Sequence, residues 1–289
     1  MEGHKMILSF LGTSGANAFP EAFCKCENCE EARVLGGVSL RKRSAVLIND
    51  DLLIDLGPDI MVSSQIHNLN LTNVSYCIQT HPHADHLDVS HLLSRSPDHG
   101  VVGAPRLNYY ASQETLQIVA RSYQEQVPNG DIFLPGTQEI MNLALHTVRP
   151  YEPFELGTYR VIPFPANHAP GLGAMLYVLT SDNRTVFYGT DSGIFREETW
   201  TAFHRFNLTF DVVILDHTYG MTKEGEDHLN ARSFVDHINR MKKEDLLSSD
   251  ARLFATHFAH SCNPVYPKLS TYARQHGYEI AFDGLRIVV

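Results

Sequence analysis

The sequence predicts an α/β protein of the α+β kind, in which two β-sheets pack face to face and helices cover their outer sides, an αββα sandwich of four layers. Short apolar runs of strand length, bounded by turn residues, recur along the chain. Strands precede helices twice, in two similar halves. With 289 residues, 43% of them hydrophobic, the chain can bury such a core. The pattern favours mostly antiparallel strands.

The first half begins with strands. Four apolar runs are expected to be strands: Met6–Leu11, Ser44–Ile48, Leu52–Asp55 and Val74–Gln79. The second and third of these form a hairpin with Asn49 and Asp50 near its tip. Residues 112–125 predict a helix, because Leu116, Val119 and Tyr123 recur at helical spacing after Ser112, a candidate N-cap.

In the second half, strands are expected at 140–148, 159–166, 174–180, 185–191, 210–218 and 251–258. Residues 231–247 predict an amphipathic helix with Phe234, Ile238 and Met241 on one face. A further helix follows a proline-rich loop after residue 261. Residues 279–289 predict a closing hairpin around Asp283 and Gly284. The sequence contains no repeat or linker, so we expect one domain over 1–289.

Charge limits the partners that the protein can have. Lysine and arginine number 23 against 33 acidic residues, which gives a formal net charge of −10. Such a chain should repel nucleic acid and anionic membranes, yet it can bind a small anionic substrate where bound cations reverse the local field. The apolar run Met6–Leu11 is too short for a signal sequence and no run reaches membrane-spanning length, so we expect a cytoplasmic protein. The sequence leaves a homodimer open.

The stretch QTHPHADHLD, residues 79–88, concentrates potential metal ligands. It follows an expected strand, so His81 and His83 should point the same way. Asp85 and His86 follow where the chain turns toward a helix. One loop can thus offer two imidazoles to one metal ion and a carboxylate with an imidazole to a second, a donor set suited to Zn²⁺, Mn²⁺ or Fe²⁺.

Two metal ions need further ligands from other strand ends. His168 in PANHAPG, Asp191 in YGTDSG and His257 in FATHFAH each end an apolar run just before a turn. A single histidine in such a place is usually a hydrogen-bonded core or rim residue. Three such residues, together with the 79–88 motif, predict a dinuclear site.

Five cysteines are present, and Cys24, Cys26 and Cys29 are bunched in FCKCENCEEA. In a reducing compartment, such a bunch indicates a metal site better than disulfides. Three thiolates leave a tetrahedral zinc ion one ligand short. His260 and Cys262, both just past His257, are candidates for the fourth ligand.

The order His-x-His-x-Asp-His, then His, Asp and His, resembles that of the metallo-β-lactamase superfamily. The resemblance implies the four-layer metallo-β-lactamase sandwich and a dinuclear site. In it, one metal ion takes His81, His83 and His168, the other takes Asp85, His86 and His257, and Asp191 bridges both.

FLGTSGANAFP followed by the three cysteines resembles one branch of the superfamily, that of the carbon–phosphorus lyase accessory phosphodiesterase, and also resembles the pyrroloquinoline quinone biosynthesis protein. The branch implies a structural zinc site near 24–29 completed by His260. It also implies cleavage of small or cyclic ribose phosphodiesters. Residues 88–135 are longer than this resemblance leads us to expect, and we interpret them as an insertion at the substrate rim.

We therefore expect a metal-dependent hydrolase, with a phosphodiesterase favoured. Two cations would lower the pKa of a shared water and stabilise charge on the substrate. Asp85 and His228 are the candidate catalytic residues, with His228 as proton donor and His217 as its rival. Asp55 and Asp216 are candidates to orient the ligating imidazoles. A lactonase or thioesterase, a tRNA-processing enzyme and a metal-binding accessory protein without turnover are the alternatives.

Overall fold

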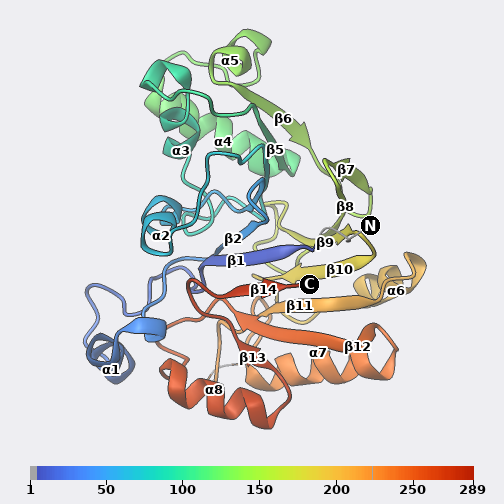
Figure 1. Ribbon diagram of the computed structural model, residues 1–289. Helices are drawn as coiled ribbons and strands as arrows, with labels where there is room; N and C mark the ends of the chain where they lie inside the picture. The colour runs from blue at the N-terminus through green and yellow to red at the C-terminus, as the bar shows by residue number, and fades with distance from the viewer. Residues whose placement is uncertain (1–4, 223) are drawn as a thin grey trace.

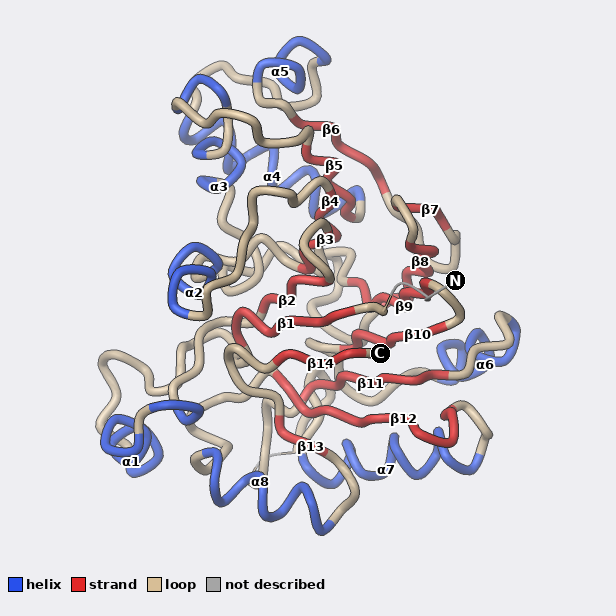
Figure 2. The backbone as a smooth tube through the Cα atoms, viewed as in Figure 1, coloured by secondary structure: helices blue, strands red, loops and turns tan. Residues whose placement is uncertain are grey.

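Two β-sheets form the interior of the molecule, and helices lie around them (Figures 1 and 2). The computed structural model describes residues 5–222 and 224–289. In these residues the first sheet has the order β14 (Arg286–Val288), β1 (Ile7–Gly12), β2 (Ala45–Ile48), β3 (Leu52–Ile54), β4 (Tyr76–Ile78), β5 (Leu107–Ala111), β6 (Leu143–Thr147). The second has the order β13 (Glu279–Ile280), β12 (Leu247–Thr256), β11 (Phe210–Asp216), β10 (Arg184–Gly189), β9 (Met175–Ser181), β8 (Tyr159–Pro165), β7 (Phe154–Leu156).

The helices form the outer layers. They are α1 (Glu27–Leu35), α2 (Ile60–Ile66), α3 (Ser90–Ser94), α4 (Gln113–Gln126), α5 (Pro135–Ile140), α6 (Glu197–Arg205), α7 (Ala231–Lys243) and α8 (Tyr266–Gln275), with short 3₁₀ turns at Gly37–Ser39 and Pro97–His99. Figure 1 shows α7 and α8 beyond β12, on the far side of the molecule from α3 and α4. Among the described residues, none of these helices has the length and apolar character needed to cross a bilayer.

Three hydrophobic cores separate the four layers. In β9, Leu176 and Val178 face the core under α6 and α7, whereas Tyr177 and Leu179 face the core between the two sheets. A strand buried on both faces needs apolar residues at every position, so β9 has a continuous apolar sequence instead of an alternating one. A third core lies between the first sheet and the helices α2 to α4. The predicted αββα sandwich is confirmed.

The expectation of mostly antiparallel strands was wrong. Six of the twelve strand pairs in the described residues are parallel: β3–β4, β4–β5, β5–β6, β10–β11, β11–β12 and β12–β13. A helix connects the two strands of each parallel pair, because parallel neighbours need a crossover connection. The strand-length runs predicted most of the strands but missed β5 and β7, and they carry no information about direction.

The predicted closing hairpin at 279–289 is also wrong. β13 pairs with β12 in the second sheet, whereas β14 pairs with β1 in the first. Asp283 lies between them, and its carboxylate accepts hydrogen bonds from Thr13 Oγ1 (2.7 Å) and the Lys42 N–H (2.7 Å). The segment around Asp283 therefore crosses from one sheet to the other and ties both to the N-terminal strand.

Residues 88–135 contribute to the core of the fold. They contain β5 in the first sheet and α4, whose buried face includes Leu116 and Val119. The predicted helix over 112–125 agrees with α4, and Ser112 caps it by accepting a hydrogen bond from the Thr115 N–H. Only the first turn of α4 reaches the cavity described below, at Gln113 and Glu114.

Candidate metal centre

The predicted ligands, and the orienting residue Asp55, follow the C-terminal ends of strands. Asp55 follows β3, and the 81–86 loop follows β4. His168, Asp191 and His257 follow β8, β10 and β12. Since β8, β10 and β12 run in the same direction, their C-terminal ends meet at one edge of the second sheet. The sheets thereby bring residues more than 170 positions apart into contact, as the 3.4 Å separation of Asp85 Oδ2 and His257 Nε2 shows.

One group consists of His81, His83 and His168. His83 Nδ1 lies 2.9 Å from His81 Nε2 and 3.2 Å from His168 Nε2. The three nitrogen atoms therefore face a common point. His81 is fully buried, while His83 and His168 are partly exposed, so this side of the centre is the one open to solvent.

A second group consists of Asp85, His86, Asp191 and His257, all buried. Asp191 Oδ2 lies 2.6 Å from His86 Nε2 and 3.2 Å from His257 Nε2. It also lies 3.4 Å from His81 Nε2 in the first group. Asp191 thus stands between the two groups, where a bridging ligand must lie.

Buried acceptors orient the imidazoles. The Nδ1 atom of His86 donates to Asp55 Oδ2 at 2.7 Å, which directs its Nε2 lone pair into the centre. His257 Nδ1 donates to Thr218 Oγ1 at 2.7 Å, and that hydroxyl donates to Asp216 Oδ2 at 2.8 Å. These contacts agree with the orienting role that the sequence suggested for Asp55 and Asp216.

The donor atoms fit divalent cations. Zinc–nitrogen distances of about 2.0–2.1 Å place two nitrogens of a tetrahedral site about 3.3 Å apart. The His83–His168 and His86–His257 nitrogen pairs are each separated by 3.2 Å. Asp191 Oδ1 is buried and forms no hydrogen bond among the described residues, although His228 Nδ1 lies 3.3 Å from it, and a bound cation would satisfy this oxygen.

The charges of the buried side chains also favour bound cations in this centre. Burial alone lowers the pKa of a histidine, but Asp85, Asp55 and Asp191 outweigh burial at His86 and hold its pKa well above the usual range. The same competition raises the pKa of His257, mainly through Asp191. The buried carboxylates therefore favour positive charge in this centre, which metal ions would supply.

The backbone also bends sharply at these strand ends. Asp55, Asp191 and His257 have φ angles of 68°, 53° and 62°, in the left-handed region. Such a conformation costs on the order of 1–3 kcal/mol at a residue other than glycine and concentrates at functional sites. It turns each side chain away from its strand and into the centre.

His228 lies beside the two groups. Its Nδ1 atom is 3.1 Å from Asp216 Oδ2 and 3.3 Å from Asp191 Oδ1, and its side chain is 13% exposed. Burial lowers the pKa of His228, but Asp216 and Asp191 raise it above the ordinary value. The following helix, α7, begins with a capping box at Asn230 and Ser233, which fixes the position of this segment.

The rival His217 lies elsewhere. It is fully buried, with Nδ1 2.9 Å from Asn263 Oδ1 and Nε2 3.1 Å from the Tyr278 hydroxyl. Burial lowers its pKa to about 4. Both ring nitrogens are occupied, so His217 has no atom to offer a substrate.

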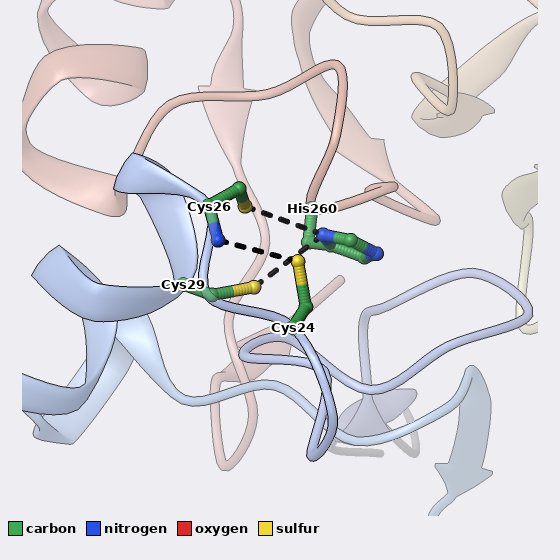
Figure 3. Close-up of side chains that lie close together, drawn as sticks. All are labelled: Cys24, Cys26, Cys29 and His260. Atoms are coloured by element: carbon green, nitrogen blue, oxygen red, sulfur yellow. Dashed lines mark hydrogen bonds between the residues drawn. The ribbon is translucent and has the colours of Figure 1, made fainter.

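A separate group brings Cys24, Cys26, Cys29 and His260 together (Figure 3). His260 Nδ1 lies 3.4 Å from Cys29 Sγ and 3.6 Å from Cys26 Sγ. Tetrahedral zinc with these donors would place nitrogen and sulfur about 3.6 Å apart. The structure thus places His260 in the group and leaves Cys262 outside it, in contact with Ser261.

Thr218, Gln79 and Thr80 were not predicted. Gln79 Nε2 donates to Asp55 Oδ1 at 3.0 Å, and the Thr80 N–H donates to the same oxygen at 2.7 Å. All three lie close in sequence to predicted residues: Thr218 follows Asp216 by two positions, and Gln79 and Thr80 directly precede His81. Hydrogen-bonding residues beside expected ligands are therefore the signal that could have found them.

A cavity of about 590 Å³ opens beside His168. Its wall combines apolar side chains, including Met175 and Val148, with two cationic ones, Arg149 and Arg196. The cavity adjoins the solvent-facing side of the metal centre and is large enough to bind a small molecule there.

Fold and donor arrangement together define a metallo-β-lactamase-type protein, with helices outside two packed sheets and histidine and aspartate residues gathered at the strand ends. A family model described as the Beta-lactamase superfamily domain matches residues 51–258, so the chain belongs to this superfamily. No curated protein sequence matches the chain.

Solved structures share the fold at low sequence identity. A diphosphatase from the PhnP family is 21% identical with a TM-score of 0.73, and the match covers 98% of this chain and 97% of that one. Zn²⁺-bound PqqB from Methylobacterium extorquens is 15% identical with a TM-score of 0.68, covering 97% and 99%. Human tRNase Z, short form, is 15% identical with a TM-score of 0.61, covering 97% and 98%. Proteins with these different names have the same architecture, so the likeness establishes the fold alone.

Proposed function

We propose that this protein is a dinuclear metal-dependent phosphodiesterase that acts on small phosphodiesters. One observation carries the proposal: seven side chains from the ends of four strands converge in two groups of donors with Asp191 between them. The first group is partly open to solvent and adjoins a cavity of small-molecule size.

Two divalent cations, zinc or manganese, would supply Lewis acidity and a water of lowered pKa. His81, His83 and His168 would hold one, and Asp85, His86 and His257 the other, with Asp191 shared. Asp85 stays ionised, because His86 and His257 outweigh the effect of burial and hold its pKa well below the usual range. Asp55, Thr218 and Asp216 keep the donor atoms directed inward.

His228 would donate a proton to the leaving oxygen. Asp216 and Asp191 occupy the side of its Nδ1 atom, which leaves Nε2 for the substrate. Positioned proton donors of this kind contribute about 10²–10⁴-fold to the rate. Replacement of His228 by Asn should therefore lower kcat more for poor leaving groups than for nitrophenolate, which leaves without a proton.

The names of two similar structures, a diphosphatase and tRNase Z, support cleavage of phosphate esters or anhydrides. The net charge of −10 argues against an RNA substrate, because a chain that grips a polynucleotide needs cationic surface. A small phosphodiester is the substrate that fits both the charge and the cavity.

The test is a panel of bis(p-nitrophenyl) phosphate, cyclic ribose phosphates, lactones and thioesters, offered to protein reconstituted with Zn²⁺ or Mn²⁺. We expect turnover of phosphodiesters that EDTA removes and added metal restores. Asp191→Ala should abolish it while circular dichroism shows an intact fold. Turnover confined to lactones or thioesters would replace the proposal with a lactonase or thioesterase, and turnover of nothing would favour an accessory protein.

A further inference from the structure

A second cavity, of about 290 Å³, lies in the core between the first sheet and the helices α2 and α3. In the described part of the chain, it shares no lining residue with the cavity beside His168, and none of the expected metal ligands lines it. Its wall is mainly apolar, with side chains from β3, α2 and β5 that include Leu53, Ile60 and Leu107. A concave apolar wall of this kind can hold the apolar body of a small molecule.

Among the described residues that line this cavity, Arg95 alone carries a permanent charge. Its guanidinium donates to the carbonyls of Asn142 at 3.2 Å and Pro105 at 2.7 Å, and it forms no ion pair with a carboxylate in the described chain. Burial lowers the pKa of Arg95, and the Cys77 thiol, not a carboxylate, is the group that opposes this effect. Since a guanidinium has five N–H donors, Arg95 keeps donors with which it can bind an anion.

His91 adds a nitrogen atom without a partner to the same wall. Its Nε2 atom donates to the Gly57 carbonyl at 3.1 Å, whereas its Nδ1 atom is buried and has no hydrogen-bond partner among the described residues. The residue is only 7% exposed, and a buried polar atom without a partner costs free energy. His91 and Arg95 lie four residues apart at the end of α3, so they are on the same side of this helix. One polar group of a ligand can therefore contact both.

We propose that this cavity is a binding site for a small monocarboxylic acid with an apolar body. The carboxylate pairs with the Arg95 guanidinium, which suits carboxylates through its paired N–H donors, and it accepts a hydrogen bond from Nδ1 of a protonated His91. The apolar body packs against the surrounding aliphatic side chains and displaces water from them. A neutral ligand would leave the charge of Arg95 uncompensated, and a second carboxylate would be buried against apolar side chains.

A matched ligand pair tests the role of charge. Calorimetry on the metal-loaded protein would compare hexanoate with hexanamide, which has the same apolar body without the negative charge. We expect hexanoate to bind at least tenfold more tightly. Arg95→Met should bring the ratio of the two affinities toward one, whereas Arg95→Lys keeps the positive charge and should retain part of the ratio. A ratio near one in the wild type, or an unchanged ratio in Arg95→Met, would overturn the proposal.

Two neighbouring valines test the location of the acid. Val101 lines the cavity and is 36% exposed, so a tryptophan there can fill the cavity without entering the rest of the core. Val102→Trp is the matched control, because Val102 is 94% exposed and does not line the cavity. Val101→Trp should weaken hexanoate binding at least tenfold, and the control should bind hexanoate like the wild type. Carboxylates also bind metal ions, so hexanoate binding that Val101→Trp leaves unchanged would place the acid elsewhere and overturn the proposal.

Binding of the acid does not depend on the proposed phosphodiesterase activity, since the expected metal ligands lie outside this cavity. Cleavage of bis(p-nitrophenyl) phosphate by the same metal-loaded protein separates the two proposals. If no phosphodiester is cleaved while hexanoate binding responds to Arg95→Met and Val101→Trp as expected, the proposed function fails and the acid site stands. If phosphodiesters are cleaved and the two ligands bind equally, only the acid site fails.

Discussion

Asp216 shows how one buried residue organises the site. Its Oδ2 atom accepts the Asp191 N–H at 3.2 Å and the Thr218 hydroxyl at 2.8 Å, and it lies 3.1 Å from His228 Nδ1. The carboxylate thereby fixes the bridging aspartate, the relay to His257 and the proposed proton donor at once. Conservative substitutions of residues that contact Asp216 should therefore affect metal affinity more than they affect the stability of the fold.

Thr218→Val should lower the affinity of the second metal ion about 10–100-fold, because it removes the hydroxyl that orients His257. Competition with a chromogenic chelator measures this affinity. Thr190→Val is the matched control, since the buried Thr190 hydroxyl has no hydrogen-bond partner in the described residues. Equal affinities in the two variants would contradict the role of Thr218.

His217 makes stability depend on pH. Burial lowers its pKa to about 4 from the ordinary value of 6.5, so the unfolded chain binds a proton that the folded chain refuses. The contribution of His217 to the stability of the folded state is thus complete above pH 6.5. It is lost as the pH falls toward 4, and the loss amounts to about 3 kcal/mol.

His217→Gln should reduce this pH dependence. The free energy of unfolding, measured in urea at pH 7 and at pH 4.5, should fall less in the variant than in the wild type. Because the other titrating groups are the same in both proteins, comparing how the free energy of unfolding changes with pH in the two proteins isolates the contribution of His217. If the free energy of unfolding changed equally with pH in both proteins, His217 would be protonated as readily in the folded state as in the unfolded one.

At the scale of elements, the cysteine group connects α1 to the loop after β12. His260 in that loop lies three residues after His257, so the same short segment serves both donor groups. Phe19 and Arg41 exchange backbone hydrogen bonds of 2.8 and 2.6 Å, which fasten the cysteine loop to the first sheet. Zinc held here would stabilise the loop that positions His257.

Cys29→Ser should remove one metal ion per chain and lower the melting temperature, because ligand loss removes binding free energy from the folded state. Elemental analysis and calorimetry measure the two effects. Cys262→Ser is the control, since Cys262 lies close in sequence to His260 but outside the group. Loss of metal in Cys262→Ser would show that Cys262 is a zinc ligand, and an unchanged metal content in Cys29→Ser would contradict zinc binding by Cys29.

At the scale of the whole molecule, we expect about three metal ions per chain, two in the centre and one in the cysteine group. Metals that bind only the folded state stabilise it by about 2.7 kcal/mol at a free concentration of 100 times Kd. EDTA should therefore lower the melting temperature, and readdition of zinc should restore it. A melting temperature insensitive to chelation would contradict metal binding by the folded chain.

Sequence pattern predicted much of the fold and of the candidate site. The helix with Phe234, Ile238 and Met241 on one face is α7, with all three buried, and the residues predicted as ligands lie together in three groups. The pattern missed β5 and β7, and it failed on strand direction, on the separation of β13 from β14, and on the hydrogen-bonding residues Gln79, Thr80 and Thr218. β5 and β7 are short strands, whereas the other failures concern a neighbour that is distant in sequence or a hydrogen bond that no periodicity encodes.

The sequence by itself determined most of the local elements and the metal-ligating side chains that the chain offers, because side-chain type and spacing along the chain decide both. Only the tertiary structure decided which strands are parallel, that β14 joins the first sheet, that His228 and not His217 faces the metal centre, and that Arg149 and Arg196 share a cavity with His168. These outcomes depend on contacts between remote segments, and such contacts form only when the two sheets pack.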